Sequence, residues 1–180
     1  SAVARAAYKI SIDIDPAELQ KQTLKIDLPI CADAGKFIRL MADELATQKI
    51  PPKPDWLAWC KERIRRYPVV LPEYRQEGNP VNPYVFSDTL ARSLGANDVV
   101  VSSNGSSCVM PIQTMQIKRG QRHIVNSGSA AMGYGLPAAI GACFASGGKR
   151  VICLEGDGSI QMNIQELETV HYHHLPLKIF

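Results

Sequence analysis

The sequence predicts an α/β protein built on a parallel sheet with helices on both faces. Past residue 82, short apolar runs alternate with stretches of helical periodicity, which is the pattern of a parallel sheet linked by helices. The apolar runs are continuous, as in strands buried on both faces. Turns of small residues follow three of these runs, at the carboxyl ends of strands, where such sheets bind ligands.

Residues 1–50 contain two predicted strands and two helix starts. Residues 9–14 and 28–31 are predicted strands. Asp15 precedes Pro16, which suits a helix that begins with a capping aspartate and a proline in its first turn. A longer helix is predicted over residues 35–48, with Phe37, Ile38, Met41 and Leu45 on its apolar face.

Residues 51–81 are predicted to link two domains. Prolines at 51, 52 and 54 end the preceding segment, and residues 56–67 are predicted to form one helix. Residues 68–83 hold four prolines, and we expect the domain boundary there.

Residues 82–180 form the second predicted domain. Asn82 and Pro83 begin a helix with Phe86, Leu90 and Leu94 on one face. Predicted strands cover residues 98–102, 123–125 and 151–154. A helix of small residues is predicted over 137–145, and helical periodicity resumes after residue 159.

Composition excludes several classes of protein. The apolar content of 46% and charged content of 21% are those of a globular protein. A net charge of +3 is too small to indicate a nucleic-acid partner or an anionic membrane surface. No run of 18 apolar residues or signal-peptide pattern occurs. The five cysteines form no CxxC pair, so we expect free thiols in a reducing compartment, the cytoplasm.

Three loops at strand ends are the candidate ligand site: Asn104–Ser107, Gly128–Met132 and Gly156–Ser159. Glycines permit close backbone approach, and free N–H groups at a helix start attract phosphate. Asp157 offers an oxygen ligand for Mg²⁺ bridging phosphates. A tight turn with an aspartate cap is the alternative for Gly156–Ser159. Convergence of three such loops favours a binding site.

Other motifs have simpler interpretations. Gly133–Ala138 fits the GxGxxA dinucleotide fingerprint, but the preceding strand ends too early for the tight turn, so close helix packing is preferred over a nicotinamide or flavin site. His171, His173 and His174 are expected at the surface rather than on a metal. Glu155 and Asp157 are candidates for an acid–base pair, although the turn between them is expected to aim them apart.

Three stretches together resemble the acetolactate synthase branch of the thiamine diphosphate enzymes: Ile12–Glu18, Ala131–Ala142 and Glu155–Met162, followed by Gln165–Leu167. The resemblance extends from about Tyr8 to Phe180. It implies that residues 1–50 are the end of a Rossmann-like central domain, and that residues 82–180 are the first half of the diphosphate-binding domain, an incomplete thiamine diphosphate-binding fold.

The resemblance also implies roles for individual residues. Asp157 would be the Mg²⁺ ligand, and Gly156, Gly158 and Ser159 would contact the diphosphate. Met132 would form the apolar wedge beneath the bent cofactor, and its N–H would meet the pyrimidine ring. The Ala130 carbonyl would accept a hydrogen bond from the amino group of that pyrimidine. Asn104, Gly105, Ser106 and Ser107 would form the second diphosphate loop. The resemblance therefore implies thiamine diphosphate and Mg²⁺ as cofactors, and it leaves open whether FAD is bound as well.

The implied activity is that of a 2-keto acid decarboxylase or carboligase, a lyase or transferase, working as a homodimer or homotetramer. The sequence differs from the family at two places: Ser106 and Ser107 replace Gln-His, and Ala130 replaces glycine. The Ala130 contact is expected to survive if its φ is negative. The catalytic glutamate and the asparagine pair of the metal motif have no match, so we expect a fragment that is inactive alone. A non-catalytic binding homologue or scaffold is the alternative.

Overall fold

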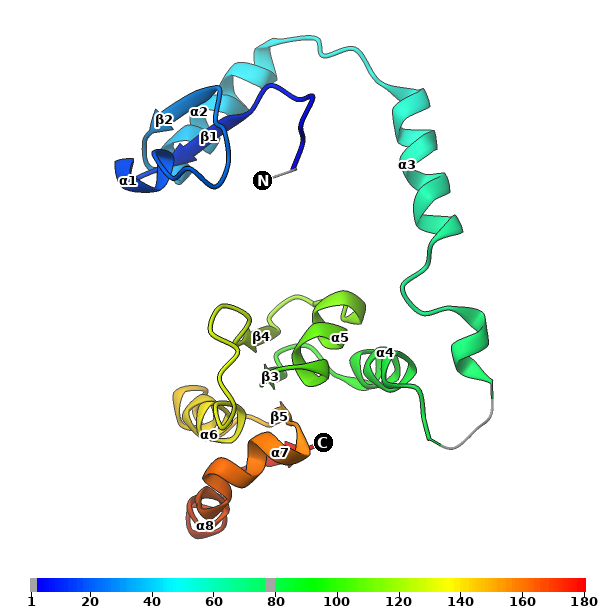
Figure 1. Ribbon diagram of the computed structural model, residues 1–180, viewed down its shortest axis with the longest axis vertical. Helices are drawn as coiled ribbons and strands as arrows, with labels where there is room; N and C mark the ends of the chain where they lie inside the picture. The colour runs from blue at the N-terminus through cyan, green and yellow to red at the C-terminus, as the bar shows by residue number, and fades with distance from the viewer. Residues whose placement is uncertain (1–2, 77–79) are drawn as a thin grey trace. The chain divides into compact units, whose positions relative to one another are not determined.

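The computed structural model describes residues 3–76 and 80–180, and it divides the chain into two compact units, Ser1–Trp59 and Cys60–Phe180 (Figure 1). The division falls within helix α3 (Pro54–Arg66). Residues 77–79 of the predicted linker, and residues 1 and 2, lie outside the described residues. The three predicted segments, 1–50, 51–81 and 82–180, therefore stay a prediction.

The first unit contains two strands and two helices close to the predicted positions: β1 (Ile10–Asp13), α1 (Pro16–Leu19), β2 (Leu28–Cys31) and α2 (Ala34–Thr47). The strands pair in parallel, with Ile10 opposite Leu28. As predicted, Asp15 caps α1 by accepting a hydrogen bond from the Ala17 N–H at 2.8 Å. On α2, the side chains of the predicted apolar face at positions 38, 41 and 45 are exposed.

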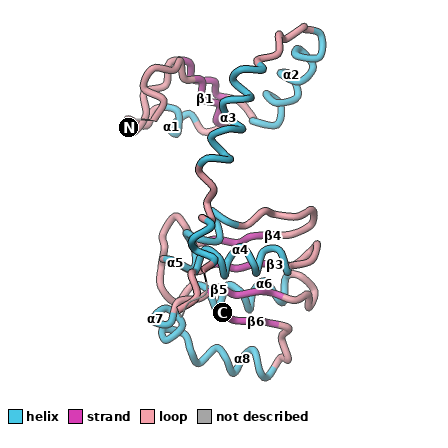
Figure 2. The backbone as a smooth tube through the Cα atoms, turned by 90° about the vertical axis from the view of Figure 1, so that its right-hand side faces the viewer, coloured by secondary structure: helices cyan, strands magenta, loops and turns pink. Residues whose placement is uncertain are grey.

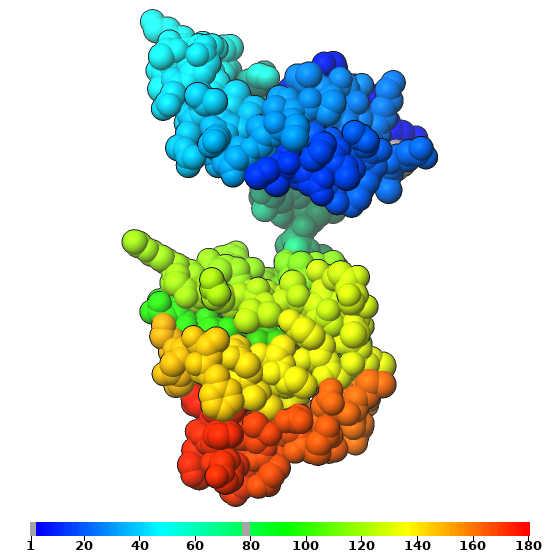
Figure 3. All heavy atoms as spheres, turned by 90° about the vertical axis from the view of Figure 1, so that its left-hand side faces the viewer, coloured from blue at the N-terminus to red at the C-terminus, as the bar shows by residue number. Residues whose placement is uncertain are grey.

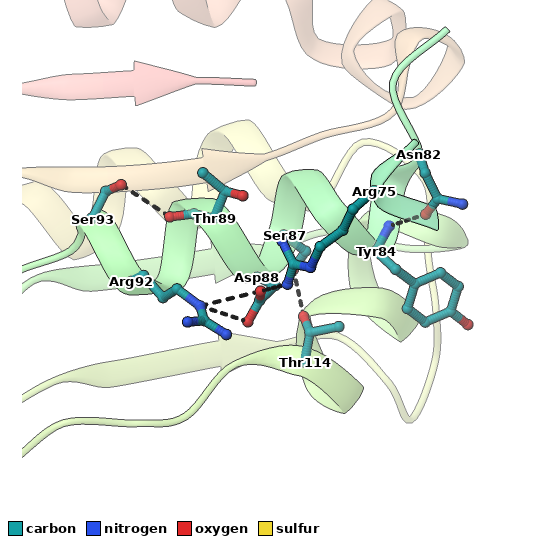
Figure 4. A network of polar contacts seen from close by, with 9 residues as sticks. All are labelled: Arg75, Asn82, Tyr84, Ser87, Asp88, Thr89, Arg92, Ser93 and Thr114. Carbon is teal, nitrogen blue, oxygen red and sulfur yellow. Dashed lines mark hydrogen bonds and ion pairs between the residues drawn. The ribbon is translucent and has the colours of Figure 1, made fainter. Parts of the chain in front are cut away.

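The second unit begins with α3 residues, a short 3-10 helix η1 (Pro72–Arg75) and α4 (Pro83–Ser93). Asn82 caps α4 as predicted, accepting from the Tyr84 N–H at 2.9 Å. Figure 4 shows how Asp88 of α4 pairs with both Arg75 of η1 and Arg92. The same close-up shows Ser87 turned toward Thr114, and their hydroxyl oxygens lie 2.7 Å apart. These contacts attach η1 and α4 to the domain.

The core of the second unit is a four-stranded sheet in the order β4-β3-β5-β6. Its strands are β3 (Val99–Ser102), β4 (Arg122–Val125), β5 (Val151–Leu154) and β6 (Leu177–Ile179). Every neighbouring pair is parallel, and the strands lie side by side in Figure 2. The predicted parallel sheet is confirmed, and β6 is a strand that the sequence analysis did not predict.

Helices cover both faces of the sheet, as predicted. Helix α6 (Gly135–Ala145) packs Ala139 and Cys143 against Val101 and Cys153 on one face. On the opposite face, Leu90 of α4 and Leu94 join Val100, Ile152, Leu154 and Met115. Figure 1 looks nearly along the strands and shows α6 on one side and α4 with α5 on the other. Figure 3 shows the side of the second unit that α6 covers, and the yellow atoms of this helix lie at the surface there.

Two local features differ from the sequence analysis. Helix α5 (Ser106–Thr114) was not predicted, because Pro111 lies inside it and proline normally disfavours a helix interior. Pro111 is buried, so packing outweighs that preference. The helical pattern after residue 159 is not one helix: α7 (Asp157–Ile160), the 3-10 helix η2 (Gln161–Glu166) and α8 (Leu167–Tyr172) replace it.

Within the described residues, no helix is both long enough and apolar enough to cross a membrane.

Candidate functional site

The candidate site lies at the carboxyl edge of the sheet, where β3, β4 and β5 end. The three strands are parallel, and Ser102, the last residue of β3, lies opposite both Val125, the last residue of β4, and Leu154, the last residue of β5. The loops that follow the strands therefore start at the same edge of the sheet. These are the three loops that the sequence analysis singled out.

Hydrogen bonds join the three loops to one another. The Asn104 side chain donates to the Ala130 carbonyl at 3.4 Å, which connects the first loop to the second. The Ser159 hydroxyl accepts from the Gly133 N–H at 2.8 Å and lies 3.1 Å from the Ser103 hydroxyl. The structure thus brings the predicted loops together, while the ligand roles of their residues remain predictions.

The first loop leads into an uncapped helix. Gly105 has a φ of +55°, a conformation that favours glycine, and a Cβ there would meet no atom within 4 Å. Among the described residues no side chain caps α5, so the N–H groups of its first turn, at Ser106 and Ser107, can bind a ligand. The Ser107 hydroxyl donates to the Asn104 carbonyl at 2.7 Å and fixes the loop. This arrangement suits a phosphate oxygen.

The third loop presents Asp157 to solvent. Its Oδ1 accepts from the Gly158 N–H at 2.9 Å, whereas Ser159 is buried. The described residues hold no group of three His, Cys, Asp or Glu side chains arranged for a metal, so a metal here would depend on Asp157 and on oxygens of its ligand. Mg²⁺ commonly binds in this way, through one or two carboxylates, phosphates and waters, so the residues present fit Mg²⁺ with a diphosphate.

The backbone of the second loop does not meet the condition stated for the Ala130 contact. That contact was expected to survive if φ is negative, and Ala130 has a φ of +51°. An alanine in this region carries a strain of roughly 1–2 kcal/mol. Met132 is 47% exposed, and its methyl group lies 3.5 Å from where a Cβ on Gly158 would be. The candidate wedge is therefore next to the candidate diphosphate turn.

A cavity of about 190 Å³ opens beside the first and third loops. Ser106, Ser107 and Gly156 are among the residues that line it, together with the apolar residues Phe86, Met110 and Leu154. Ligand pockets for whole drug-sized molecules are typically about 300–1,000 Å³. The cavity has room for part of a ligand, with the uncapped start of α5 at its wall.

Glu155 has a structural role that sequence reasoning missed. Its Oε2 accepts from the Leu136 N–H at 3.1 Å, and its Oε1 accepts from the Gly156 N–H at 3.2 Å. A carboxylate at the start of α6 is stabilised by the helix dipole. Glu155 and Asp157 therefore bind different backbone groups, which agrees with the expectation that the turn aims them apart.

Gly135 is required for this contact. A Cβ on Gly135 would lie 2.9 Å from the Glu155 carboxyl carbon and 2.8 Å from the Ser103 Cβ. Strand β4 ends at Val125 while α6 begins only at Gly135, so the tight turn of a dinucleotide fingerprint is absent from this described segment. The geometry supports the close-packing interpretation of Gly133–Ala138.

Two further polar residues hold the second loop and were also missed. The Asn126 side chain donates to the Ala131 carbonyl at 3.1 Å, and the Asn163 side chain donates to the Gly133 carbonyl at 2.6 Å. Asn126 directly follows a predicted strand, which is a signal that could have found it. Nothing in the sequence around Asn163 marks it.

Burial shifts the pKa of several groups near the sheet, among them His123 and Cys153. Desolvation lowers the pKa of His123, whose Nε2 lies 2.8 Å from the Ser102 hydroxyl oxygen. Burial also raises the pKa of the Cys153 thiol to about 12, with the nearby Glu155 carboxylate acting in the same direction. His171, His173 and His174 are exposed, as expected.

Comparison with known proteins agrees with the motifs. Residues 103–180 match the family described as thiamine pyrophosphate enzyme, C-terminal TPP binding domain. Over 96% of its length the chain is 34% identical to the acetolactate synthase large subunit of Pyropia yezoensis, of which it covers 29%. The acetolactate synthase isozyme 3 large subunit of Escherichia coli (strain K12) is 33% identical over 96% of the chain and 30% of that protein. The chain thus spans less than a third of the length of these relatives.

Proposed function

We propose that the chain belongs to the acetolactate synthase-like family of thiamine pyrophosphate enzymes and that it holds the diphosphate and Mg²⁺ of that cofactor. The observation that carries the proposal is the joining of three loops, an uncapped helix and an exposed aspartate at one sheet edge. The match of residues 103–180 to the C-terminal TPP binding domain supports it.

Each loop has a distinct task in this proposal. Asp157 holds Mg²⁺, and Gly156, Gly158 and Ser159 line the diphosphate. Asn104, Gly105, Ser106 and Ser107 bind the other side of the diphosphate, where the positive end of α5 offsets its charge. The two sets of donors approach the ligand from the ends of adjacent strands, β3 and β5.

Met132 and Ala130 are proposed to meet the organic part of the cofactor. When bound, thiamine diphosphate supplies an electron sink for the loss of CO₂ from a 2-keto acid. Met132 supports it with an unbranched, polarizable side chain that adapts to the ring. The Ala130 carbonyl accepts a hydrogen bond from the pyrimidine amino group; in the structure this carbonyl already accepts from Asn104.

For the whole protein we propose a 2-keto acid decarboxylase or carboligase that assembles as a homodimer or homotetramer. The exposed apolar side chains of the second unit, among them Val109, Ile112 and Phe144, support burial against another subunit. The five free cysteines support a reducing compartment such as the cytoplasm. We propose that these 180 residues alone release no CO₂ from pyruvate, because none matches the family's catalytic glutamate.

Calorimetric titration of the chain with thiamine diphosphate tests the cofactor proposal. We expect weak binding that requires Mg²⁺ and that Asp157→Ala abolishes. Asp43→Ala, an exposed aspartate on α2, is the matched control and should bind as the unaltered chain does. Equal affinity in Asp157→Ala and the control would place the metal elsewhere.

A non-catalytic binding homologue is the second candidate. The serines at 106 and 107, and the strained Ala130, are the observations that favour it. The whole protein distinguishes the two, since a decarboxylase releases CO₂ from a 2-keto acid whereas a binding homologue takes up the cofactor without turnover.

A further inference from the structure

The peptide groups of Gly133 are held from both sides by two side chains of one segment. The Gly133 N–H donates to the Ser159 hydroxyl at 2.8 Å, and the Gly133 carbonyl accepts from the Asn163 amide at 2.6 Å. Gly133, Ser159 and Ser103 are all buried, and the two serine hydroxyls lie 3.1 Å apart. Losing a partner in such a buried set leaves a polar group unsatisfied.

Asn163 interrupts the helical segment in order to make its contact. Its φ of −136° and ψ of 31° are not helical, although Ile160 and Leu167 on either side have helical angles. The segment Gln161–Glu166 contains no glycine or proline, so the usual sequence causes of a kink are absent. The hydrogen bond to Gly133 is the compensation that the structure shows for this break.

Gly133 leaves no room for a side chain at this contact. Its φ is +80°, and a Cβ would lie 2.8 Å from the Asn163 amide nitrogen and 3.0 Å from the Met162 Cβ. The second loop and the segment after β5 are therefore packed at backbone distance. A shift of one of them requires a shift of the other.

Met132 immediately precedes this residue and reaches across to Gly158. We propose that Ser159 and Asn163 are positioning residues that clamp Gly133 and thereby fix Met132 over the Gly156–Ser159 turn. The clamp is a property of the chain itself; its consequence for Met132 as a cofactor wedge rests on the proposed function.

Amide hydrogen exchange in the chain without any ligand tests the clamp. The variants are Ser159→Ala, which removes the acceptor, and Asn163→Asp, which keeps the shape but loses the donor. Gln165→Ala, an exposed side chain on η2, is the control. We expect exchange at the Gly133 amide to accelerate about tenfold or more in both variants, the equivalent of losing roughly 1.4 kcal/mol of a buried hydrogen bond.

Asn163→Asp is the decisive variant, because it leaves the bond from the Gly133 N–H to Ser159 in place. Faster exchange at Gly133 in this variant shows that both bonds act together, whereas unchanged exchange overturns the clamp. Exchange at Val101 and Cys153, in the core strands, must stay unchanged to show that the variant is folded. If Asn163→Asp fails that check, Asn163→Ala is judged by the same criterion.

Titration with thiamine diphosphate and Mg²⁺ then tests the positioning of Met132. We expect Asn163→Asp as a single substitution to weaken cofactor binding about tenfold. In a chain that already carries Met132→Ala it should weaken binding little further, since the effects of coupled sites are not additive. Full additivity overturns the positioning role. Absence of all cofactor binding in the unaltered chain, with the expected exchange at Gly133, contradicts the proposed function and leaves the clamp standing.

Discussion

Gly135→Ala is predicted to destabilise the chain although it adds a single methyl group to a helix. The new Cβ would lie 2.8 Å from the Ser103 Cβ and 2.9 Å from the Glu155 carboxyl carbon. Real Cβ atoms essentially never approach heavy atoms this closely. Glu155 must therefore move, and it loses the hydrogen bond from the Leu136 N–H.

The size of this destabilisation follows from two unfavourable effects and one favourable effect. Overpacking costs about 1–3 kcal/mol, and a lost hydrogen bond to a charged group costs about 1.5–3 kcal/mol. Reduced freedom of the unfolded chain returns about 0.4–1 kcal/mol. Because Glu155 is only half-buried, the net destabilisation should be near the lower end, about 2–3 kcal/mol.

Gly141→Ala is the matched control on the same helix. A Cβ on Gly141 would meet no atom within 4 Å, so this variant should gain about 0.4–1 kcal/mol. Urea unfolding followed by circular dichroism measures both variants against the unaltered chain. Equal stability of the two variants would refute the assigned contact between Gly135, Glu155 and Ser103.

Three further outcomes follow from the structure. The hydrogen bond from the Arg150 guanidinium holds the pKa of Asp98 below its ordinary value of 3.8, against the opposing effect of burial. A carboxyl group whose pKa is lower in the folded than in the unfolded protein stabilises the fold above the unfolded-state pKa, and this stability is lost as the pH falls through the folded-state pKa. Asp98→Asn should therefore make stability fall less steeply below about pH 4. If urea unfolding at acid pH shows the same loss of stability in both proteins, the ion pair is contradicted. In native protein at pH 8, iodoacetamide should label exposed Cys31 and spare Cys153, whose pKa burial raises to about 12; mass spectrometry reads the sites, and equal labelling rates would contradict the burial. Met132→Ala should weaken thiamine diphosphate binding about tenfold, roughly 1.4 kcal/mol, while Met162→Ala, also exposed, should not; equal effects in calorimetry would remove the special role of Met132.

The sequence predicted the sheet and the positions of the three loops at its carboxyl edge because those features depend on local patterns. Continuous valines at 99–101 predict a strand buried on both faces, and Asp15 and Asn82 cap helices through bonds within two residues. The loops after β3, β4 and β5 were found for the same reason: each is a short run of small residues after an apolar run.

What the sequence did not predict depends on contacts between distant residues. Pro111 argues locally against a helix, yet burial against the sheet keeps it in α5. Asn163 breaks a helical pattern only because Gly133, thirty residues earlier, offers a carbonyl. The positive φ of Ala130 likewise occurs at a residue whose carbonyl accepts a hydrogen bond from the side chain of Asn104, twenty-six residues earlier.

The most direct test of the central claim compares thiamine diphosphate with thiamine, which lacks both phosphates, in calorimetric titrations of this chain. The three-loop site is proposed to bind the diphosphate and its Mg²⁺. We therefore predict that the chain binds thiamine diphosphate in the presence of Mg²⁺ and does not bind thiamine. Binding of thiamine with equal affinity, or binding of thiamine diphosphate that is indifferent to Mg²⁺, would contradict it.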